Sequence, residues 1–342
     1  MNMDFYRKLA IPVEVKEMFP ITRLVSETME KKVLEIKQIL DGRSSRLLLI
    51  IGPCSADCED SVLDYISRLV PVQEKVKDKI MIVPRIYTNK PRTTGEGYKG
   101  LLHQPDPTDK PDLFKGLIAV RELHMRVVAE TGFGCADEML YPDNHKYLDD
   151  ILVYVAVGAR SVENQEHRLT ASGIEVPVGM KNPTGGDFSV MMNAITAAHH
   201  QHTFIYRGWE THSFGNPYAH AILRGYTDKH RQHHPNYHYE DLELLCDFFD
   251  RYELPNPAAL VDTNHSNSGK DPFRQPLIIR EVLQNRRFNT RIEKLIKGFM
   301  VESYIESGSQ PVGGGCYGQS ITDPCLGWKE TEEMIYRMAD ML

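Results

Sequence analysis

The stretch "RLLLIIGPCS" (residues 46–55) sets five consecutive aliphatic residues against a Gly-Pro break and a polar end at Cys54. A run this short, bounded by a turn, is typical of a strand that is buried on both faces. Seven similar runs follow along the chain, at 80–87, 133–139, 153–159, 176–181, 220–225, 259–265 and 297–303. Segments of helical character separate several of them, at 60–70, 113–130, 144–153 and 187–200. Eight strands with intervening helices predict an α/β fold, a (β/α)₈ barrel.

Two segments lie outside this alternation. Residues 24–40 have apolar side chains at helical spacing and end at Asp41-Gly42, which predicts one amphipathic helix before the first strand. Residues 202–216 combine a strand-like run with turn residues, which predicts a small hairpin inserted before the sixth barrel strand. We therefore expect a short N-terminal extension with its helix over residues 1–45, and a single catalytic barrel domain over residues 46–342.

Each of the eight predicted strands ends on a polar or ionisable side chain. In chain order these residues are Cys54, Arg85, Glu138, Arg160, Lys181, Arg224, His265 and Glu302. Ordinary surface exposure would place Ser, Asn or Thr at several of these ends. The active site of a (β/α)₈ barrel, by contrast, collects side chains from the carboxyl ends of many strands. The pattern therefore favours an enzyme with its site at that face.

A candidate metal site emerges from the first, seventh and eighth strands, which become neighbours when the barrel closes. Cys54, His265 and Glu302 end these strands, and Asp323 lies in the following loop. One thiolate, one imidazole and two carboxylates suit Mn²⁺, Fe²⁺, Co²⁺ or Zn²⁺ rather than a structural four-cysteine zinc site. Taken singly, a buried cysteine is usually inert and a histidine is usually a surface or core residue. We prefer a metal site to these alternatives only because the three strands are neighbours in the barrel.

A set of cations indicates anionic substrates. Arg85, Arg160, Lys181 and Arg224 all stand at strand ends, and Lys90 and Arg92 follow the second strand. Structural ion pairs would explain one or two of these cations, but not all of them. The string "KPRTTGEG" (90–97) adds hydroxyls and glycines, which is typical of a loop that grips phosphate. We expect one or more substrates that carry several phosphate or carboxylate groups. Since neither a P-loop nor a Rossmann glycine motif is present, no nucleotide cofactor is expected.

The net charge, the length of the apolar runs and the cysteine content narrow the class of protein further. The net charge of −7 disfavours both nucleic acid and an anionic membrane surface as partners. The longest aliphatic run is five residues, and charged residues interrupt the N-terminus where a signal peptide would need an apolar core. We therefore expect a cytoplasmic protein. In that compartment six dispersed cysteines are a poor disulfide framework, so metal binding or catalysis becomes the better explanation for Cys54.

The motifs together resemble those of the metal-dependent 3-deoxy-D-arabino-heptulosonate 7-phosphate (DAHP) synthases, in the subgroup found in enteric bacteria and yeast. The resemblance runs from about residue 11 to the C-terminus. Its strings are "IGPCS", "KPRTT", "YKGLLHQPD", "GARSVENQEHRLTASG", "PVGMKNPTGG", "HAILRG", "VDTNHSNSGKD", "MVES" and "YGQSITDPCLGW". It implies a (β/α)₈ transferase that condenses phosphoenolpyruvate with erythrose 4-phosphate and water, releases phosphate by C–O cleavage, and so performs the first step of the shikimate pathway.

The resemblance also implies roles for individual residues. One divalent metal ion is held by Cys54, His265, Glu302 and Asp323. Phosphoenolpyruvate is held by Arg85, Lys90, Arg160, Lys181 and Arg224. Erythrose 4-phosphate is held by Lys90, Arg92, Thr93 and Asp323. The residues expected to act in the reaction itself are Lys90, Glu138, His265 and Asp323, with Glu138 or a metal-bound water handling the proton at C2 of phosphoenolpyruvate. Cys58 receives no role.

Several points stay open on the sequence. Another phosphoenolpyruvate-dependent aldose synthase, of the octulosonate 8-phosphate or sialic acid type, is the alternative enzyme, although "KPRTT" and the chain length oppose it. A catalytically silent regulatory barrel is the alternative outside the enzymes. We expect a homo-oligomer, a dimer or a tetramer. Feedback-inhibited members of the family use an N-terminal extension and the hairpin to bind aromatic amino acids. Here the extension is shorter, the hairpin looks abbreviated, and Glu175 replaces a small residue, so we expect weak or absent feedback.

Overall fold

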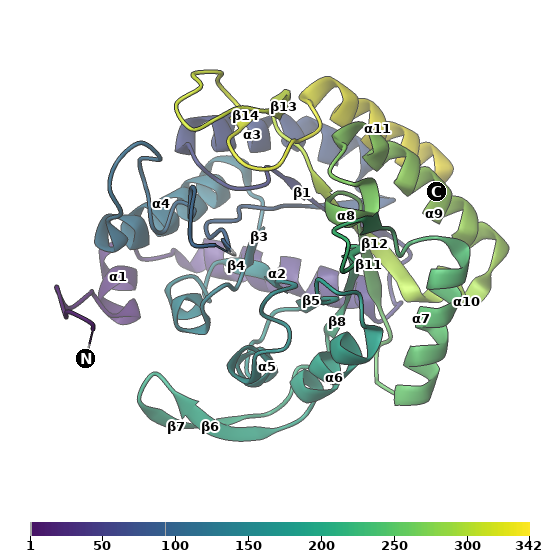
Figure 1. Ribbon diagram of the computed structural model, residues 1–342, viewed down its shortest axis with the longest axis horizontal. Helices are drawn as coiled ribbons and strands as arrows, with labels where there is room; N and C mark the ends of the chain where they lie inside the picture. The colour runs from purple at the N-terminus through teal and green to yellow at the C-terminus, as the bar shows by residue number, and fades with distance from the viewer. Residues whose placement is uncertain (1, 93) are drawn as a thin grey trace.

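Eight parallel strands form the barrel in a computed structural model that describes residues 2–92 and 94–342 (Figure 1). Their order around the barrel is β2-β1-β12-β11-β8-β5-β4-β3. A bridge between Arg85 and Ala136, with Ile86 N donating to Ala136 O at 2.8 Å, closes the sheet between β2 and β3. The strands are β1 Leu47–Gly52, β2 Ile80–Pro84, β3 Cys135–Glu138, β4 Leu152–Val157, β5 Val178–Lys181, β8 Ala219–Leu223, β11 Ala259–Asp262 and β12 Ile296–Glu302. The predicted (β/α)₈ fold is confirmed.

Helices surround the strands, as Figure 1 shows. Four of them, α4, α5, α6 and α10, begin at a residue whose side chain caps the helix. The fourth helix, for example, begins where the Asp112 side chain accepts from the N–H groups of Phe114 and Lys115, and it ends at Gly132 in the left-handed conformation. The helices of the outer layer are α3 Glu59–Val76, α4 Leu113–Thr131, α5 Gln165–Ser172, α6 Phe188–His199, α7 Tyr239–Tyr252, α9 Gln275–Phe288, α10 Thr290–Leu295 and α11 Trp328–Met341.

One predicted helix is absent from the connection between β3 and β4. Residues 144–153 were expected to be helical, but the structure has only the short 3₁₀ helix η1, Pro142–Tyr147, before β4 begins at Leu152. The helix predicted at 24–40 is confirmed as α2, Arg23–Leu40, and it contacts both β1 and β4. These two strands are not neighbours in the barrel. Helix α2 therefore lies across the amino end of the barrel, where it buries Met29, Ile36, Ile39 and Leu40.

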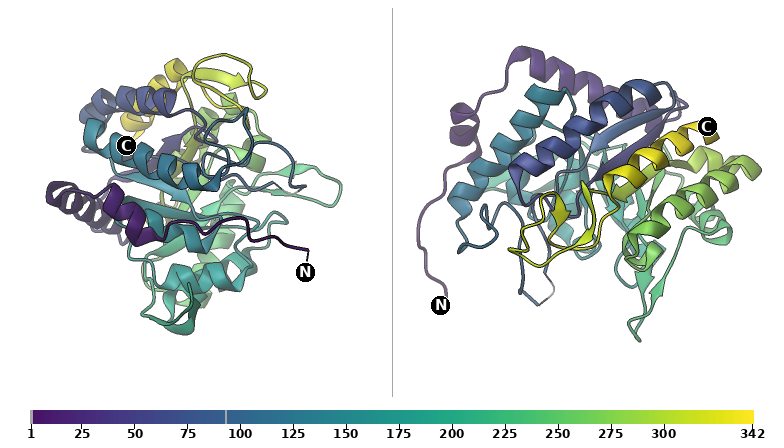
Figure 2. Two further views of the ribbon diagram at one scale, coloured as in Figure 1. Left: turned by 90° about the vertical axis from the view of Figure 1, so that its left-hand side faces the viewer. Right: turned by 90° about the horizontal axis from the view of Figure 1, so that it is seen from above.

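The hairpin predicted before the sixth barrel strand is also confirmed. It consists of β6, His202–Tyr206, and β7, Trp209–Ser213, paired antiparallel ahead of β8. The remaining elements lie before, between or after the barrel strands: α1 Pro12–Met18, β9 Tyr226–Thr227, β10 His233–His234, α8 His265–Ser268, η2 Pro272–Arg274, β13 Glu306–Ser309 and β14 Gln319–Ser320. Residues 2–11, before α1, have no regular structure and run along the outside of the barrel (Figure 2), where Arg7 forms an ion pair with Asp112.

Seven of the eight barrel strands are buried along their whole length, and in β12 only Lys297 is partly exposed. All six residues of β1 are buried, as the run of aliphatic side chains predicts. No helix in residues 2–92 and 94–342 is long and apolar enough to cross a membrane. Because α2 covers the amino end of the barrel, the carboxyl ends of the strands are left to carry the polar residues.

Candidate active site

Three of the four predicted metal ligands come together at the carboxyl end of the barrel. One donor atom each from Cys54, Glu302 and Asp323 lies within 4.8 Å of the other two. Cys54 follows β1 and Glu302 ends β12, which pairs directly with β1, so the register of the two strands sets their separation. Asp323 approaches from the loop before α11, and its backbone N–H donates to Cys54 Sγ at 3.4 Å. Closure of the barrel thus brings Cys54 beside donors that follow it by 248 (302 − 54) and 269 residues.

His265, the fourth predicted ligand, stands at the edge of this group. Its Nε2 lies 3.9 Å from Glu302 Oε1. The residue begins the short helix α8 with φ = 39°, in the left-handed region that a β-carbon disfavours. Thiolate, imidazole and carboxylate donors at these separations fit a divalent ion of the first transition row. The donor set therefore fits the kind of metal site that the sequence predicts.

Lys90 reaches into the same group from the loop after β2. Its Nζ lies 2.6 Å from Cys54 Sγ and 3.2 Å from the Cys54 carbonyl oxygen. Burial by itself would lower the pKa of Lys90, but the negative charges of Cys54, Glu302 and Asp323 raise it above the ordinary lysine value. Lys90 is therefore a permanent cation beside the cluster.

The acidic members of the group differ in their ionisation. Burial raises the pKa of the Cys54 thiol, Glu302 raises it further, and Lys90 opposes both. Burial also disfavours the charged form of Glu302, but Arg85, His265 and Lys90 outweigh it and lower the pKa of that carboxyl. Asp323 behaves likewise, because Lys90 and Lys270 overcome its burial and lower its pKa. The carboxylates are thus ready to bind a cation, whereas the thiol must give up a proton to do so.

The cations at the mouth are paired with carboxylates that lie far away in the sequence. Arg85 Nη2 lies 3.0 Å from Glu302 Oε1, and both side chains are only 1% exposed. Lys181 Nζ lies 3.6 Å from Glu138 Oε2 and 3.8 Å from Asp262 Oδ2. The adjacent sequence had suggested cations with few acidic partners. The tertiary structure supplies those partners from other strands, because the carboxyl ends of parallel strands meet at one face.

The remaining predicted anion ligands lie around the same mouth. Arg224 is buried just after β8, and its pKa is lowered first by burial, while Arg160 also lowers it by charge repulsion. Arg160 is exposed at the carboxyl end of β4. Arg92 Nε donates to the Tyr98 carbonyl oxygen at 2.8 Å, which holds its guanidinium over the loop. Thr93 lies outside the described residues.

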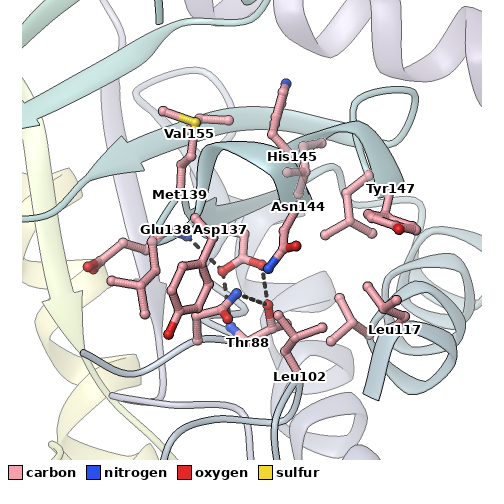
Figure 3. A pocket seen from close by; sticks show the side chains of 16 residues that line it. Thr88, Leu102, Leu117, Asp137, Glu138, Met139, Asn144, His145, Tyr147 and Val155 are labelled. Atoms are coloured by element: carbon pink, nitrogen blue, oxygen red, sulfur yellow. Dashed lines mark hydrogen bonds between the residues drawn. The ribbon is translucent and has the colours of Figure 1, made fainter. Parts of the chain in front are cut away.

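Glu138, the predicted acid or base, ends β3 next to a buried carboxylate that sequence reasoning missed. Figure 3 shows the Asp137 carboxylate facing Thr88, whose backbone N–H and hydroxyl donate to it at 3.0 and 2.5 Å. The Glu138 N–H donates to Asp137 as well, at 2.7 Å. Asp137 therefore links the end of β3 to the chain that leads to Lys90. The cavity drawn in Figure 3 measures only about 30 Å³ and cannot hold the substrates.

Other residues of the site also escaped the sequence reasoning. Asp262 stands three positions before His265, at the end of β11, and its acidic side chain directly after a buried strand was a signal that could have found it. Two further residues carried no such signal. The ring of Tyr87 lies 3.8 Å from the Arg85 guanidinium, and Lys270 pairs with Asp323 at 3.0 Å.

The six cysteines are all free, and the spacing of Cys54 and Cys58 does not reflect a pair. Cys58 is exposed and stands at the start of α3. The sulfur that does lie beside Cys54 is Cys325 Sγ, which accepts from the Cys54 N–H at 3.4 Å. Only Cys54 of the sequence pair belongs to the site.

Known proteins match this chain over nearly its whole length. The family model described as "DAHP synthetase I family" matches residues 13–335. The chain is 36% identical over 339 residues to the Trp-sensitive phospho-2-dehydro-3-deoxyheptonate aldolase of Escherichia coli K12, covering 97% of this chain and 94% of that protein. It is 36% identical over 337 residues to the phospho-2-dehydro-3-deoxyheptonate aldolase of Haemophilus influenzae, covering 96% and 90%.

A solved structure gives the same result. The phospho-2-dehydro-3-deoxyheptonate aldolase of Francisella tularensis SCHU S4 superposes with a TM-score of 0.91 at 29% identity, over 99% of this chain and 98% of that one. The match of fold and of sequence leads to one conclusion: the chain belongs to the DAHP synthetase I family, whose members act on phosphoenolpyruvate and erythrose 4-phosphate in the first step of the shikimate pathway.

Proposed function

We propose that the barrel mouth of this chain condenses phosphoenolpyruvate with D-erythrose 4-phosphate and water to give DAHP and inorganic phosphate. The observation that carries the proposal is the convergence of Cys54, Glu302 and Asp323 within 4.8 Å, with the Lys90 ammonium in contact with Cys54. A potential metal site beside a fixed cation suits a reaction between two anionic substrates, one of which must become electrophilic.

Phosphoenolpyruvate is assigned to Arg85, Lys90, Arg160, Lys181 and Arg224. Guanidinium groups bind phosphate and carboxylate oxygens in pairs, and a lysine adds a point charge. Burial of Arg85 and Arg224 supports this role, because a cation removed from water binds an anion more strongly than an exposed one. Burial also lowers the pKa of Arg224, and the negative charge of a bound anion would raise that pKa again.

Erythrose 4-phosphate is assigned to Lys90, Arg92, Thr93 and Asp323. The loop that carries the first three contains several glycines in the left-handed conformation, among them Gly95 and Gly97, so its backbone can turn sharply around a phosphate. Because Lys90 belongs to both substrate sets, it holds together two polyanions that would otherwise repel each other.

One divalent ion, Mn²⁺, Fe²⁺, Co²⁺ or Zn²⁺, is assigned to Cys54, His265, Glu302 and Asp323. When bound, such an ion supplies Lewis-acid polarisation of an aldehyde oxygen. Glu138 is assigned to take up the proton released when water adds to C2 of phosphoenolpyruvate. Its carboxylate lies 3.6 Å from Lys181, a residue assigned to the same substrate, which supports that position.

The wider organisation is part of the same proposal. Residues 46–342 form one catalytic barrel domain, and residues 1–45 form an extension whose helix α2 closes the amino end. We assign the protein to the cytoplasm and to a dimer or tetramer. The exposed Ile205, Trp209 and Phe214 on and beside the hairpin support self-association, since a monomer gains nothing from exposing them.

Phosphate release measured from the two substrates, with and without a chelator, tests the proposed reaction. We expect rapid release that requires both substrates, stops when the metal is removed and returns when Mn²⁺ or Co²⁺ is added. Release that continues after complete metal removal would contradict the metal assignment. Release with other aldose phosphates but not with erythrose 4-phosphate would contradict the substrate assignment.

A further inference from the structure

A buried carboxylate outside the proposed ligand set faces one of its members. Asp262 ends β11 and is completely buried. Its Oδ2 lies 2.7 Å from His265 Nδ1, and its Oδ1 accepts from the Asn264 backbone N–H at 3.1 Å. The Asp262 carboxyl is therefore held against the imidazole of His265.

This contact decides which nitrogen of His265 is available to a metal. Asp262 Oδ2 and His265 Nδ1 are both buried, and neither has another hydrogen-bond partner among the described residues. Since a carboxylate only accepts, a proton on Nδ1 of the neutral imidazole would satisfy both atoms and leave the lone pair on Nε2. Nε2 is the atom that lies 3.9 Å from Glu302 Oε1, on the side of the Cys54 cluster. Carboxylates that orient a ligating histidine in this way recur in metal sites and raise the basicity of the ring.

The backbone around His265 supports the need for such an anchor. The residue has φ = 39°, and a side chain in this strained conformation keeps its direction only if its surroundings hold it. The neighbouring Asn264 donates through Nδ2 to Glu302 Oε2. One turn after β11 thus orients two of the proposed ligands, His265 through Asp262 and Glu302 through Asn264.

A second function of Asp262 competes with this one. Its Oδ2 also lies 3.8 Å from Lys181 Nζ, and Lys181 belongs to the proposed phosphoenolpyruvate set. If Asp262 served mainly to place Lys181, its loss would raise the KM for phosphoenolpyruvate and leave metal affinity unchanged. The 2.7 Å contact with His265 is much shorter than the contact with Lys181, so the geometry favours the metal side.

We propose that Asp262 is a positioning residue that holds His265 with Nδ1 protonated and Nε2 directed at the metal. The inference rests on the proposed function, because it takes His265 as a ligand. Asp262→Gln would change the length of the side chain, whereas Asp262→Asn keeps its shape and removes only the charge. The amide can still accept through one oxygen, but it no longer raises the basicity of the ring.

The first test is a titration of metal-free protein with Co²⁺ against a competing chelator. Relative to wild type, Asp262→Asn is expected to bind Co²⁺ about 10- to 100-fold more weakly, with a normal circular dichroism spectrum. Glu281→Gln is the matched control, because Glu281 Oε1 faces His238 Nδ1 at 2.6 Å on the outer helices, and its affinity should not change. Unchanged Co²⁺ affinity in Asp262→Asn with a raised KM for phosphoenolpyruvate would overturn the inference.

The second test uses the wild-type protein and so does not depend on the folding of a variant. The NMR spectrum of the Co²⁺ form should contain a hyperfine-shifted ring N–H signal that disappears in ²H₂O and is missing in His265→Ala. The absence of that signal in wild type would overturn the proposed tautomer. His265→Ala distinguishes failure of the proposed ligand set from failure of the role of Asp262. If His265→Ala binds Co²⁺ as wild type does, His265 is not a ligand. If His265→Ala binds Co²⁺ weakly but Asp262→Asn binds it normally, only the role of Asp262 is rejected.

Discussion

At the scale of single residues, the position of a residue at a strand end predicted its place in the site better than its residue type did. Cys54 and Cys58 are the same residue four positions apart, yet one is buried beside Lys90 and Glu302 and the other is exposed at the start of α3. Chemistry therefore depends on which residue ends the strand.

Cys54→Ala should abolish metal-dependent turnover, because it removes a proposed ligand and leaves Lys90 without its sulfur partner. Cys58→Ala should keep nearly full activity. Initial rates and Co²⁺ affinity of the two variants provide the measurement, and each variant is the control for the other. Equal losses in both variants would contradict the assignment.

His220 offers a prediction on stability that is independent of the site. It is buried on β8, with Nδ1 donating to the Tyr218 carbonyl at 2.9 Å and Nε2 accepting from the Tyr154 hydroxyl at 2.8 Å. Burial lowers its pKa from 6.5 to about 4. Between these values the unfolded chain binds a proton that the folded protein does not, so His220 lowers the free energy of unfolding by up to about 3 kcal/mol as the pH falls from 7 to 4.

The variant His220→Gln isolates this contribution, because the amide still accepts from Tyr154 but does not titrate. Denaturant unfolding of both proteins at several pH values should show the advantage of wild type shrinking as the pH falls. A difference that stays constant with pH would mean that His220 does not remain neutral in the folded protein.

At the scale of elements, close backbone contact positions the strands that carry the ligands. A β-carbon added to Gly298, in β12, would lie 1.9 Å from the Leu48 carbonyl oxygen in β1. These are the two strands that end at Glu302 and lead to Cys54. The spacing of the proposed metal ligands therefore depends on a residue with no side chain.

Gly298→Ala should destabilise the fold by more than about 3 kcal/mol, since the atom that it meets belongs to the backbone and cannot turn away. Gly185→Ala is the control, because a β-carbon there meets nothing within 4 Å, and its effect should stay within about 0.5 kcal/mol. Thermal and denaturant unfolding measure both. A stable Gly298→Ala protein would show that β1 and β12 can move apart.

At the scale of the whole molecule, a large cavity lies away from the barrel mouth. It measures about 960 Å³ and lies between α2, the segment around η1, the end of α5 and the β6–β7 hairpin. Its lining includes Glu30, Asp149 and Glu175. Burial lowers the pKa of Lys37 in the same lining, and the negative charge of Glu175 only partly opposes that effect. The hairpin, which looks abbreviated in the sequence, has five residues in each of its two strands.

We expect weak or absent inhibition by aromatic amino acids, because Glu175 places a carboxylate where a small residue is usual in inhibited relatives. Initial rates should fall by less than about twofold with millimolar Phe, Tyr or Trp, and an aliphatic amino acid at the same concentration is the control. Strong inhibition by any one of the three would contradict this expectation.

Much of the barrel and of its site could be predicted from local patterns. Each buried strand is encoded by its own apolar run, and a polar residue directly after such a run faces the carboxyl end of the barrel whatever the rest of the chain does. For this reason Cys54, Glu302 and Lys181 were found without knowledge of their partners. The prediction of a helix at 144–153 was wrong, because this connection contains only the short 3₁₀ helix η1. Helix α2, from elsewhere in the chain, packs against β4, and local periodicity cannot show such a contact.

The sequence by itself thus determined the fold class, the face that carries the chemistry and the types of side chain at that face. Only the tertiary structure decided which of them touch. Arg85 pairs with Glu302, Lys90 reaches Cys54, and Asp262 faces both His265 and Lys181. The physical reason is closure of the barrel. Ring order and register bring together residues that are remote along the chain, and no local pattern of hydrophobicity or charge carries that information.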